Sequence, residues 1–257
     1  MAEPLLQVDG LTKRFGGVVP ADAITLTIAP GEVHAVIGPN GAGKTTLIGL
    51  LSGEIPPHQG RIHFDGVDIT QLPVYRRSRL GLARSFQITS LLTGFTALDN
   101  VALAVQAHRG HSFRFWRDAR REQHLREPAL AALDRVGLAE RADVRVERLS
   151  HGEHRQLEIA MALAMEPRLL LLDEPMAGMG PDESAQMVRM LQKLKGNVTI
   201  MLVEHDMEAV FALADRLTVL VYGRIIASGD PAAVREDAAV RQAYLGEKDG
   251  GQGARHG

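Results

Sequence analysis

The stretch VHAVIGPNGAGKTTLIGLLSG, residues 33–53, decides the fold that we predict for this chain. It opens with VHAVI, a short continuous run that is typical of a parallel strand buried on both faces. The segment GPNGAGKTT begins at Gly38 and fits the pattern G-x-x-x-x-G-K-[ST], and an apolar helix pattern follows it. A strand, a loop of this pattern and a helix, in this order, predict a phosphate-binding loop.

The residue types in this loop suit a nucleoside triphosphate. Its glycines let backbone N–H groups wrap the phosphates, Lys44 reaches the outer phosphates, and Thr45 offers a hydroxyl to Mg²⁺. The alternative is a glycine-rich turn that happens to precede a helix, and the lysine, the two threonines and the flanking pattern all disfavour it. The predicted nucleotide-binding residues here are Gly38, Pro39, Asn40, Gly41, Ala42, Gly43, Lys44, Thr45 and Thr46.

A second apolar run, LLLLDEP at residues 169–175, ends in two carboxylates. Asp173 suits the role of a Mg²⁺ ligand, and Glu174 can polarise a water molecule against the terminal phosphate. An acid pair at a strand end often only caps the next turn. Paired with the phosphate-binding loop, the catalytic interpretation is favoured.

Three further residues are weak candidates when each is taken alone. His205, in VEHD, follows a buried strand, at the edge where open α/β sheets place ligands, and can hydrogen-bond a γ-phosphate. Gln87, in RSFQI, is by itself more typical of a loop hydrogen bond. Phe15, in KRFGG, can stack on a base, but a buried core phenylalanine is the default interpretation.

The stretch LSHGEHRQLEIA, residues 149–160, predicts a helix start that suits an anion. Ser150 serves as N-cap, Glu153 completes a capping box, and Gly152 keeps the backbone open to close approach. The unpaired N–H groups and the positive end of the helix dipole favour a phosphate there. A plain N-cap is the alternative, and both can hold at once.

Composition and patterning place these motifs in a mixed α/β chain. The 257 residues are 45% hydrophobic and 23% charged, with a net charge of −2 and no cysteine, which excludes disulfides and thiolate metal sites. No secretory signal or membrane-spanning run is apparent, so we expect a cytosolic chain. Strands are expected at AITLTI, RIHFDGVDI, 169–172, 200–203 and around Tyr222-Gly223, and helices at PALAALDRVGL, after Ser150, near 182–195 and near 207–214.

The motifs in this order and spacing resemble the ATP-binding-cassette (ABC) ATPases, from about Leu5 to Tyr244. The resemblance implies an α/β fold: a P-loop NTPase core with an antiparallel β lobe and a helical subdomain. The expected division is 1–87 plus 166–245 for the ATP-binding core with its β lobe, 88–165 for the helical subdomain, and 246–257 for a disordered tail. The resemblance also implies ATP and Mg²⁺ as cofactors.

The resemblance also implies roles for the weaker candidates. Phe15 would stack on adenine, Gln87 would sense Mg²⁺ and the membrane partner, Glu174 would be the general base, and His205 would contact the γ-phosphate. The catalytic set is then Glu174, His205, Lys44 and Gln87, and the metal set is Thr45, Gln87 and Asp173.

In this family two ATPase subunits pack head to tail, so Ser150, Gly152 and Glu153 would bind the ATP held by a second subunit. The implied partners are an identical or paralogous ATPase subunit, membrane permease subunits and, indirectly, a solute-binding protein, with no nucleic acid. The implied location is peripheral, at the cytoplasmic face of the inner membrane. Three positions depart from the family pattern: His151 replaces a glycine, Glu153 a glutamine and Gly180 an aspartate. Communication between the two sites is therefore expected to differ.

Finer features resemble importer ATPases of the branched-chain amino acid type: LDEPMAGMGPDE, VEHDM, the insertion near 105–128 and the ending AYLGE. Relatives with similar motifs handle other small solutes or export lipopolysaccharide. A soluble ABC-type ATPase in cofactor assembly or nucleic-acid transactions stays open as an alternative. The basic and aromatic insertion, HRGHSFRFWRDARREQHLRE, fits a solvated hairpin better than a membrane-surface or nucleic-acid contact, because acids dilute its charge.

Overall fold

The structure, a computed structural model, describes residues 3–85, 91–109 and 123–242. The chain divides into two compact units. Unit 1 comprises Met1–Pro73 and Met201–Gly257, and unit 2 comprises Val74–Ile200. These boundaries differ from the expected ones after residues 87 and 165, so the functional division into a core and a helical subdomain stays a prediction. The expected tail, 246–257, lies outside the described residues.

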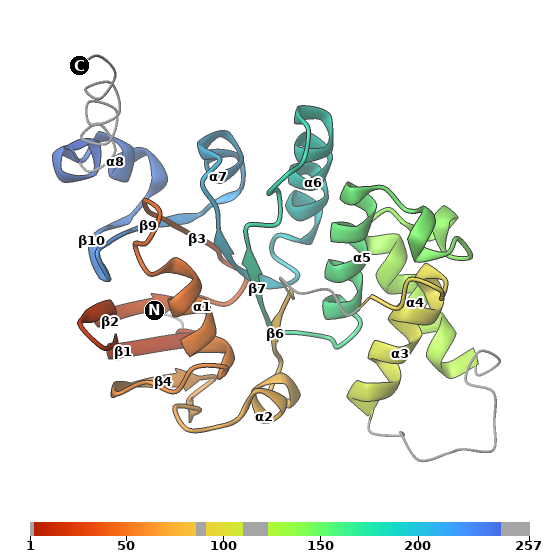
Figure 1. Ribbon diagram of the computed structural model, residues 1–257, viewed down its shortest axis with the longest axis horizontal. Coiled ribbons are helices and arrows are strands. Elements are labelled where there is room, and N and C mark those ends of the chain that lie inside the picture. Colours follow the sequence, from red (N-terminus) through yellow and green to blue (C-terminus); the bar gives the residue numbers. More distant parts are fainter. Residues whose placement is uncertain (1–2, 86–90, 110–122, 243–257) are drawn as a thin grey trace, which may run out of the picture. The chain divides into compact units, whose positions relative to one another are not determined.

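Unit 1 contains an antiparallel sheet with strand order β2-β1-β4-β5 (Figure 1). Its strands are β1 (Leu6–Phe15), β2 (Val18–Ile28), β4 (Gln59–Phe64) and β5 (Val67–Asp68). In register, Leu6 lies opposite Ile28 on one side and Phe64 on the other. Asp65 and Gly66 both have positive φ, as a two-residue hairpin turn requires. The alternating pattern and the Asp-Gly signal therefore predicted this lobe correctly.

The second sheet of unit 1 has the order β10-β9-β3, and the C-terminal half of β8 (Thr199–Val203) follows β3. Strand β3 (Val33–Ile37) is parallel to β9 (Arg216–Val221), and β10 (Arg224–Gly229) is antiparallel to β9. All five residues of β3 are buried, which explains its continuous run. Helix α1 (Lys44–Ser52) follows β3 through the glycine-rich loop.

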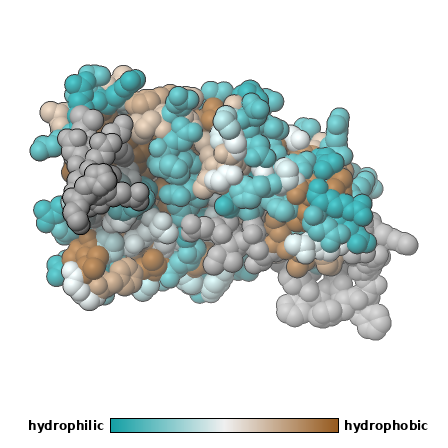
Figure 2. All heavy atoms as spheres, turned by 45° about the horizontal axis from the view of Figure 1, so that its top comes forward, coloured by the Kyte–Doolittle hydropathy of each residue, from teal (hydrophilic) through white to brown (hydrophobic). Residues whose placement is uncertain are grey.

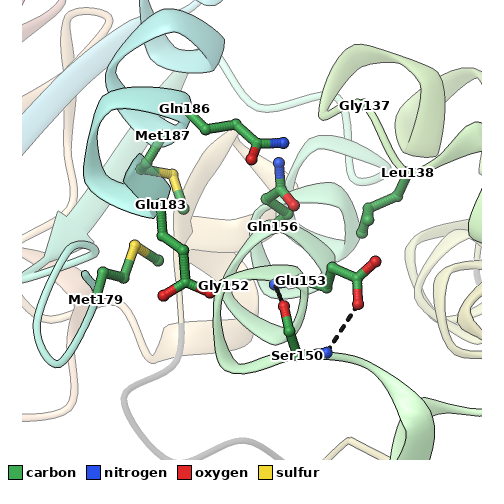
Figure 3. A pocket seen from close by; sticks show the side chains of 10 residues that line it. All are labelled: Gly137, Leu138, Ser150, Gly152, Glu153, Gln156, Met179, Glu183, Gln186 and Met187. Carbon is green, nitrogen blue, oxygen red and sulfur yellow. Dashed lines mark hydrogen bonds between the residues drawn. The ribbon is translucent and has the colours of Figure 1, made fainter. Parts of the chain in front are cut away.

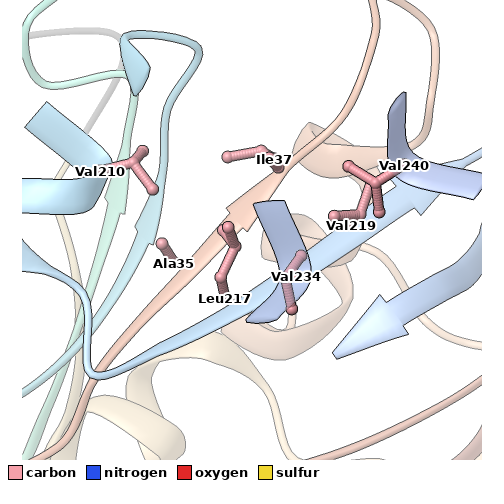
Figure 4. Packing of buried hydrophobic residues seen from close by; sticks show 7 residues of the cluster. All are labelled: Ala35, Ile37, Val210, Leu217, Val219, Val234 and Val240. Atoms are coloured by element: carbon pink, nitrogen blue, oxygen red, sulfur yellow. The ribbon is translucent and has the colours of Figure 1, made fainter. Parts of the chain in front are cut away.

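Helices α7 (Met207–Leu213) and α8 (Pro231–Glu236) close the hydrophobic core over this sheet. Figure 4 shows the cluster, in which valines from the helical segments meet side chains of β3 and β9. Its buried members are Ala35, Ile37, Val210, Leu217, Val219, Val234 and Val240. The core thus fixes the carboxyl end of β3, from which the phosphate-binding loop begins.

Unit 2 combines the strand order β8-β7-β6 with several helices. Strand β6 (Leu82–Arg84) is parallel to β7 (Leu169–Asp173), and the unit boundary falls within β8. The helices are α2 (Val74–Arg79), α3 (Ala97–Arg109), α4 (Gln123–Arg135), α5 (His151–Leu163) and α6 (Pro181–Leu194), with 3₁₀ turns at Ala139–Arg141 and Val146–Arg148. Figure 1 shows α3, α4 and α5 beside one another.

One helix differs from its sequence prediction. The stretch PALAALDRVGL suggested a helix from Pro128, but α4 runs from Gln123 to Arg135 with Pro128 inside it. A proline lacks the N–H that would bond the carbonyl four residues earlier. That carbonyl belongs to His124, and the guanidinium of Arg109 donates to it at 2.8 Å. A side chain from α3 therefore supplies the donor that the proline removes.

Hydrophilic side chains cover most of the face drawn in Figure 2, and apolar side chains show there as scattered groups. Within residues 3–85, 91–109 and 123–242, no helix combines the length and the hydropathy that crossing a membrane requires.

A buried polar chain crosses the sheet of unit 1. His34 is fully buried in β3, and its ring contacts the Glu32 carboxylate through Nδ1 and the Thr218 hydroxyl through Nε2, both at 2.8 Å. The Thr218 hydroxyl in turn lies 2.8 Å from that of Ser228. Burial raises the pKa of Glu32, but hydrogen bonds from His34 and the Ala29 N–H outweigh it and leave that pKa below its usual value.

We expect the replacement His34→Leu to lower the free energy of unfolding by about 1–3 kcal/mol, because it leaves buried polar partners unsatisfied. The measurement is denaturant unfolding followed by circular dichroism. His108→Leu is the control, since His108 is only partly buried in α3, and we expect it to change stability by less than about 0.5 kcal/mol. Equal effects of the two replacements would contradict the importance of the buried chain.

Candidate functional site

The phosphate-binding loop of unit 1 has the predicted strand–loop–helix structure. It joins the end of β3 to α1, which begins at Lys44 after Gly43 in the left-handed conformation, with φ of 106°. The Lys44 ammonium is buried and donates to the carbonyls of Gly38, at 2.6 Å, and of Pro39, at 3.1 Å. The cation is therefore held within the loop, and the exposed side chain of Thr45 lies in the first turn of α1.

Two glycines of this loop are required by packing alone. A Cβ at Gly38 would lie 2.1 Å from the carbonyl oxygen of Leu220, and one at Gly43 would lie 1.9 Å from that of Pro20. Gly41 differs, because its φ is +79° but a Cβ there would meet nothing within 4 Å. The loop backbone thus lies against two other segments of unit 1, which leaves its shape little freedom.

Unit 1 also exposes Phe15 and His205. Phe15, at the end of β1, is 51% exposed, so the default interpretation as a core residue is wrong. The Lys13 ammonium lies 5.2 Å from the centroid of its ring. His205 follows β8 and has a side chain that is 65% exposed. The buried Glu204 carboxylate accepts the backbone N–H of His205 at 3.0 Å. Glu204 is not predicted as a site residue from the sequence. The signal that could have indicated it is an acid directly after an apolar strand, the same pattern as at residues 173–174.

Unit 2 contains the two carboxylates at the end of β7. Asp173 is the last residue of the strand and is buried, and its carboxylate accepts a hydrogen bond from the Arg84 guanidinium at 3.1 Å. Glu174 has φ of 49°, which costs a non-glycine residue about 1–2 kcal/mol. The N–H of Ala177 donates to its carbonyl at 3.1 Å and closes the turn. Strain of this kind is typical of functional positions.

The start of α5 confirms the predicted capping box. The Glu153 N–H donates to the Ser150 hydroxyl at 3.2 Å, and the Ser150 N–H donates to the Glu153 carboxylate at 2.8 Å. Arg141 also donates to that carboxylate at 2.8 Å. A pocket of about 310 Å³ adjoins this helix start (Figure 3). It is lined by Gly137, Leu138, Ser150, Gly152, Glu153, Gln156, Met179, Glu183, Gln186 and Met187.

The departures from the family pattern also lie in unit 2. Gly180 is the N-cap of α6, Pro181 is its first residue as expected, and the Gly180 N–H donates to the Glu183 carboxylate at 3.3 Å. A Cβ at Gly180 would meet nothing within 4 Å, so a side chain can begin there without a clash. The ring of His151 lies 3.5 Å from where a Cβ of Gly178 would be, next to the segment that follows β7.

The candidate residues are thus distributed over the two units. Phe15, the phosphate-binding loop and His205 belong to unit 1, and Asp173, Glu174, Ser150, Gly152 and Glu153 belong to unit 2. Gln87, the ending AYLGE and residues 110–122 of the insertion lie outside the described residues. The assignment of all these residues to one nucleotide site therefore stays a proposal.

Comparisons with protein families agree with the resemblance. A family model described as "ABC transporter" matches residues 21–177. A second model, described as "Branched-chain amino acid ATP-binding cassette transporter", matches residues 224–250.

Similar proteins of known name include ATP-binding subunits. The chain is 39% identical to the high-affinity branched-chain amino acid transport ATP-binding protein BraF of Pseudomonas aeruginosa, over 96% of this chain and 100% of BraF. It is 36% identical to LivG of Escherichia coli K12, with the same description and coverage. It is 35% identical to the lipopolysaccharide export system ATP-binding protein LptB of Acidithiobacillus ferridurans, over 95% of this chain and 98% of LptB.

Solved structures give the same fold. The ADP conformation of MJ1267, an ATP-binding cassette of an ABC transporter, matches with a TM-score of 0.84 and 28% identity, over 95% of this chain and 100% of that one. A nucleotide-free ATP-binding cassette from an ABC transporter matches with a TM-score of 0.83 and 28% identity, over 94% of this chain and 99% of that one. The expected α/β fold, with a P-loop core, an antiparallel β lobe and a helical subdomain, is confirmed.

We expect Gly43→Ala to destabilise the protein more than Gly41→Ala, which makes the latter a matched control. Both glycines have positive φ, so each replacement costs about 1–2 kcal/mol in backbone strain. Only the Cβ at position 43 collides with a carbonyl, which adds about 1–3 kcal/mol. Denaturant unfolding measures the difference, and equal losses of stability would show that the contact with Pro20 is not a constraint.

Proposed function

Because this chain belongs to the ABC transporter family, we propose that it is the ATP-hydrolysing subunit of a transporter that imports branched-chain amino acids or a related small polar solute. The identity of 39% to BraF over nearly the whole chain carries the proposal. The match of residues 224–250 to the branched-chain amino acid model supports it. The similarity to LptB makes a lipopolysaccharide-type exporter the second candidate.

The nucleotide is held chiefly by the phosphate-binding loop. The Lys44 ammonium, which lies against the loop carbonyls, donates to the outer phosphates, and the backbone N–H groups of the glycine-rich loop surround them. The exposed ring of Phe15 offers a face on which adenine stacks. These assignments rest on the loop geometry of unit 1 and on the exposure of its side chains.

The donor atoms of three residues are of the kind that suits a Mg²⁺ ion. Mg²⁺ prefers hard oxygen ligands and is usually held by one or two carboxylates together with substrate phosphates. The buried Asp173 carboxylate and the exposed Thr45 hydroxyl are oxygen donors of that class, and the amide of Gln87 is a third. When bound, the ion would neutralise charge on the phosphate oxygens.

Hydrolysis requires a base and an oriented water molecule. Glu174 accepts a proton from the attacking water, and the exposed His205 side chain hydrogen-bonds the γ-phosphate. The φ of 49° at Glu174 turns the chain sharply directly after the buried strand. Asp173 is buried whereas Glu174 is half-buried, so the two acids have different surroundings and can serve different purposes.

A second ATPase subunit completes the site in this proposal. Ser150 caps a 13-residue helix that begins at His151, and the positive end of this helix dipole suits the phosphates of a nucleotide bound to the partner. Glu153 is the third residue of that helix start. The pair of subunits works on membrane permease chains, with a solute-binding protein acting indirectly, so the subunit lies peripherally at the cytoplasmic face of the membrane.

We expect Glu174→Gln to lower the rate of ATP hydrolysis by about 10²-fold or more while ATP still binds, because an amide cannot accept the proton. Phosphate release from the purified full chain measures the rate, and a fluorescent ATP analogue measures binding. The control is Glu166→Gln, which changes an exposed acid of unit 2 that also has positive φ, at 51°. Hydrolysis at the normal rate by the Glu174→Gln variant would contradict its assignment as the base.

We expect the tagged protein, extracted from its native membranes in mild detergent, to co-purify with polytopic permease chains. Detergent covers the apolar surfaces of permease chains and keeps them in solution, so the same purification from the soluble fraction without detergent is the control. Recovery of a second, different ATPase would identify a paralogous partner. Recovery of the protein only in the soluble fraction, without membrane partners, would favour the alternative of a soluble ABC-type ATPase in cofactor assembly or nucleic-acid transactions.

A further inference from the structure

A buried carboxylate lies where the chain of unit 1 passes from strand β8 to helix α7. Glu204 directly follows β8 and is fully buried, whereas the side chain of the next residue, His205, is 65% exposed. A glutamate is almost never buried completely unless polar groups compensate its charge, because the loss of hydration is costly. The groups that surround this carboxylate therefore indicate what the residue does.

Main-chain donors compensate the charge. Oε2 of Glu204 accepts the N–H of His205 at 3.0 Å and, more weakly, the N–H of Asp206 at 3.4 Å. The Asp206 carboxylate in turn caps α7, because it accepts the N–H groups of Glu208 at 2.9 Å and of Ala209 at 3.2 Å. Two acids in succession thus hold the main chain between the end of the strand and the first turn of the helix.

The same turn is tied to the strand that leads into the phosphate-binding loop. The N–H of Glu204 donates to the carbonyl of Val36 in β3 at 3.4 Å, two residues before the loop begins at Gly38. Nδ1 of His205 lies 3.7 Å from Oε2 of Glu204, which is beyond hydrogen-bond distance. The Glu204 carboxylate therefore holds the backbone of His205 through hydrogen bonds and does not hold its ring in this way.

We propose that Glu204 is a positioning residue for ATP hydrolysis, which fixes the backbone of His205 relative to β3 so that the imidazole reaches the γ-phosphate in one geometry. This inference rests on the proposed function, in which His205 makes that contact. A misplacement of about 1 Å can lower a rate by about 10²-fold, so a restraint of this kind affects turnover more than nucleotide binding. Glu204 acts only through His205.

The experiment measures kcat and KM for ATP with the purified full chain, and nucleotide binding with a fluorescent, non-hydrolysable ATP analogue. Glu204→Leu keeps a similar volume but removes both acceptor oxygens. We expect its kcat to fall about tenfold or more, while the binding of the analogue changes less than about twofold. Glu204→Gln keeps one acceptor oxygen for the two N–H groups, so we expect it to rescue most of the loss and to lower kcat only about threefold.

A double-mutant cycle makes the test specific. When His205→Ala is already present, we expect Glu204→Leu to lower kcat no further, because its effect passes through the lost imidazole. Asp230→Ala is the matched control: it removes another acid of unit 1 whose carboxylate accepts two N–H groups, those of Ala232 at 2.9 Å and Ala233 at 3.2 Å. We expect this control to leave kcat unchanged.

The outcomes separate the inference from the proposed function. An unchanged kcat in folded Glu204→Leu, or an equal loss with and without the His205 side chain, overturns the inference and leaves Glu204 a structural role only. If Glu204→Leu does not fold, as judged by circular dichroism, Glu204→Gln decides by the same comparison. A wild-type protein that neither binds the analogue nor hydrolyses ATP contradicts the proposed function itself. A loss of kcat that requires His205 supports both.

Discussion

The close approach of backbone to backbone around the phosphate-binding loop is the constraint on which unit 1 depends. Gly38 lies against the carbonyl of Leu220 and Gly43 against that of Pro20, with no room for a Cβ at either position. The N–H of Gly223 also donates to the carbonyl of Ala42 at 2.9 Å. The loop therefore joins the antiparallel lobe, the β9–β10 turn and helix α1 in one rigid arrangement. Such rigidity is what a preorganised phosphate site requires.

In unit 2 the corresponding constraint is electrostatic. Two of the candidate carboxylates have a defined partner: Arg84 holds Asp173, and Arg141 together with the Ser150 N–H holds Glu153. The pair with Asp173 is buried, so its geometry is fixed more firmly than that of the exposed pair. The glutamate that replaces the family's glutamine thus performs a structural task at the helix start, and its charge is offset by Arg141.

The comparisons and the geometry answer different questions about function. Identity to BraF and LivG over almost the whole chain gives the family and its ATPase activity. The geometry shows how Lys44 is held, how the chain turns at Glu174 directly after Asp173, and how the helix start at Ser150 is capped. The solute itself is expected to bind to other chains of the transporter. The site residues of this chain therefore suit ATP hydrolysis and carry no information about the solute.

The sequence by itself determined the features that arise from residues close together along the chain. The strand–loop–helix at 33–53, the Asp65-Gly66 hairpin and the capping box at Ser150 and Glu153 follow from local patterns, and the structure contains each of them. Membership of the ABC family could also be predicted, because it rests on the order and spacing of such motifs.

Only the tertiary structure decided which distant residues meet. Arg84 and Asp173 are 89 positions apart, and His34 and Thr218 are 184 apart. Their contacts exist because parallel strands bring them into register. The same holds for Arg109, which supplies the donor that Pro128 lacks, and for Phe15, whose exposure depends on what packs around β1. Local patterns contain no information about these partners, since strand pairing and helix packing select them only when the chain folds.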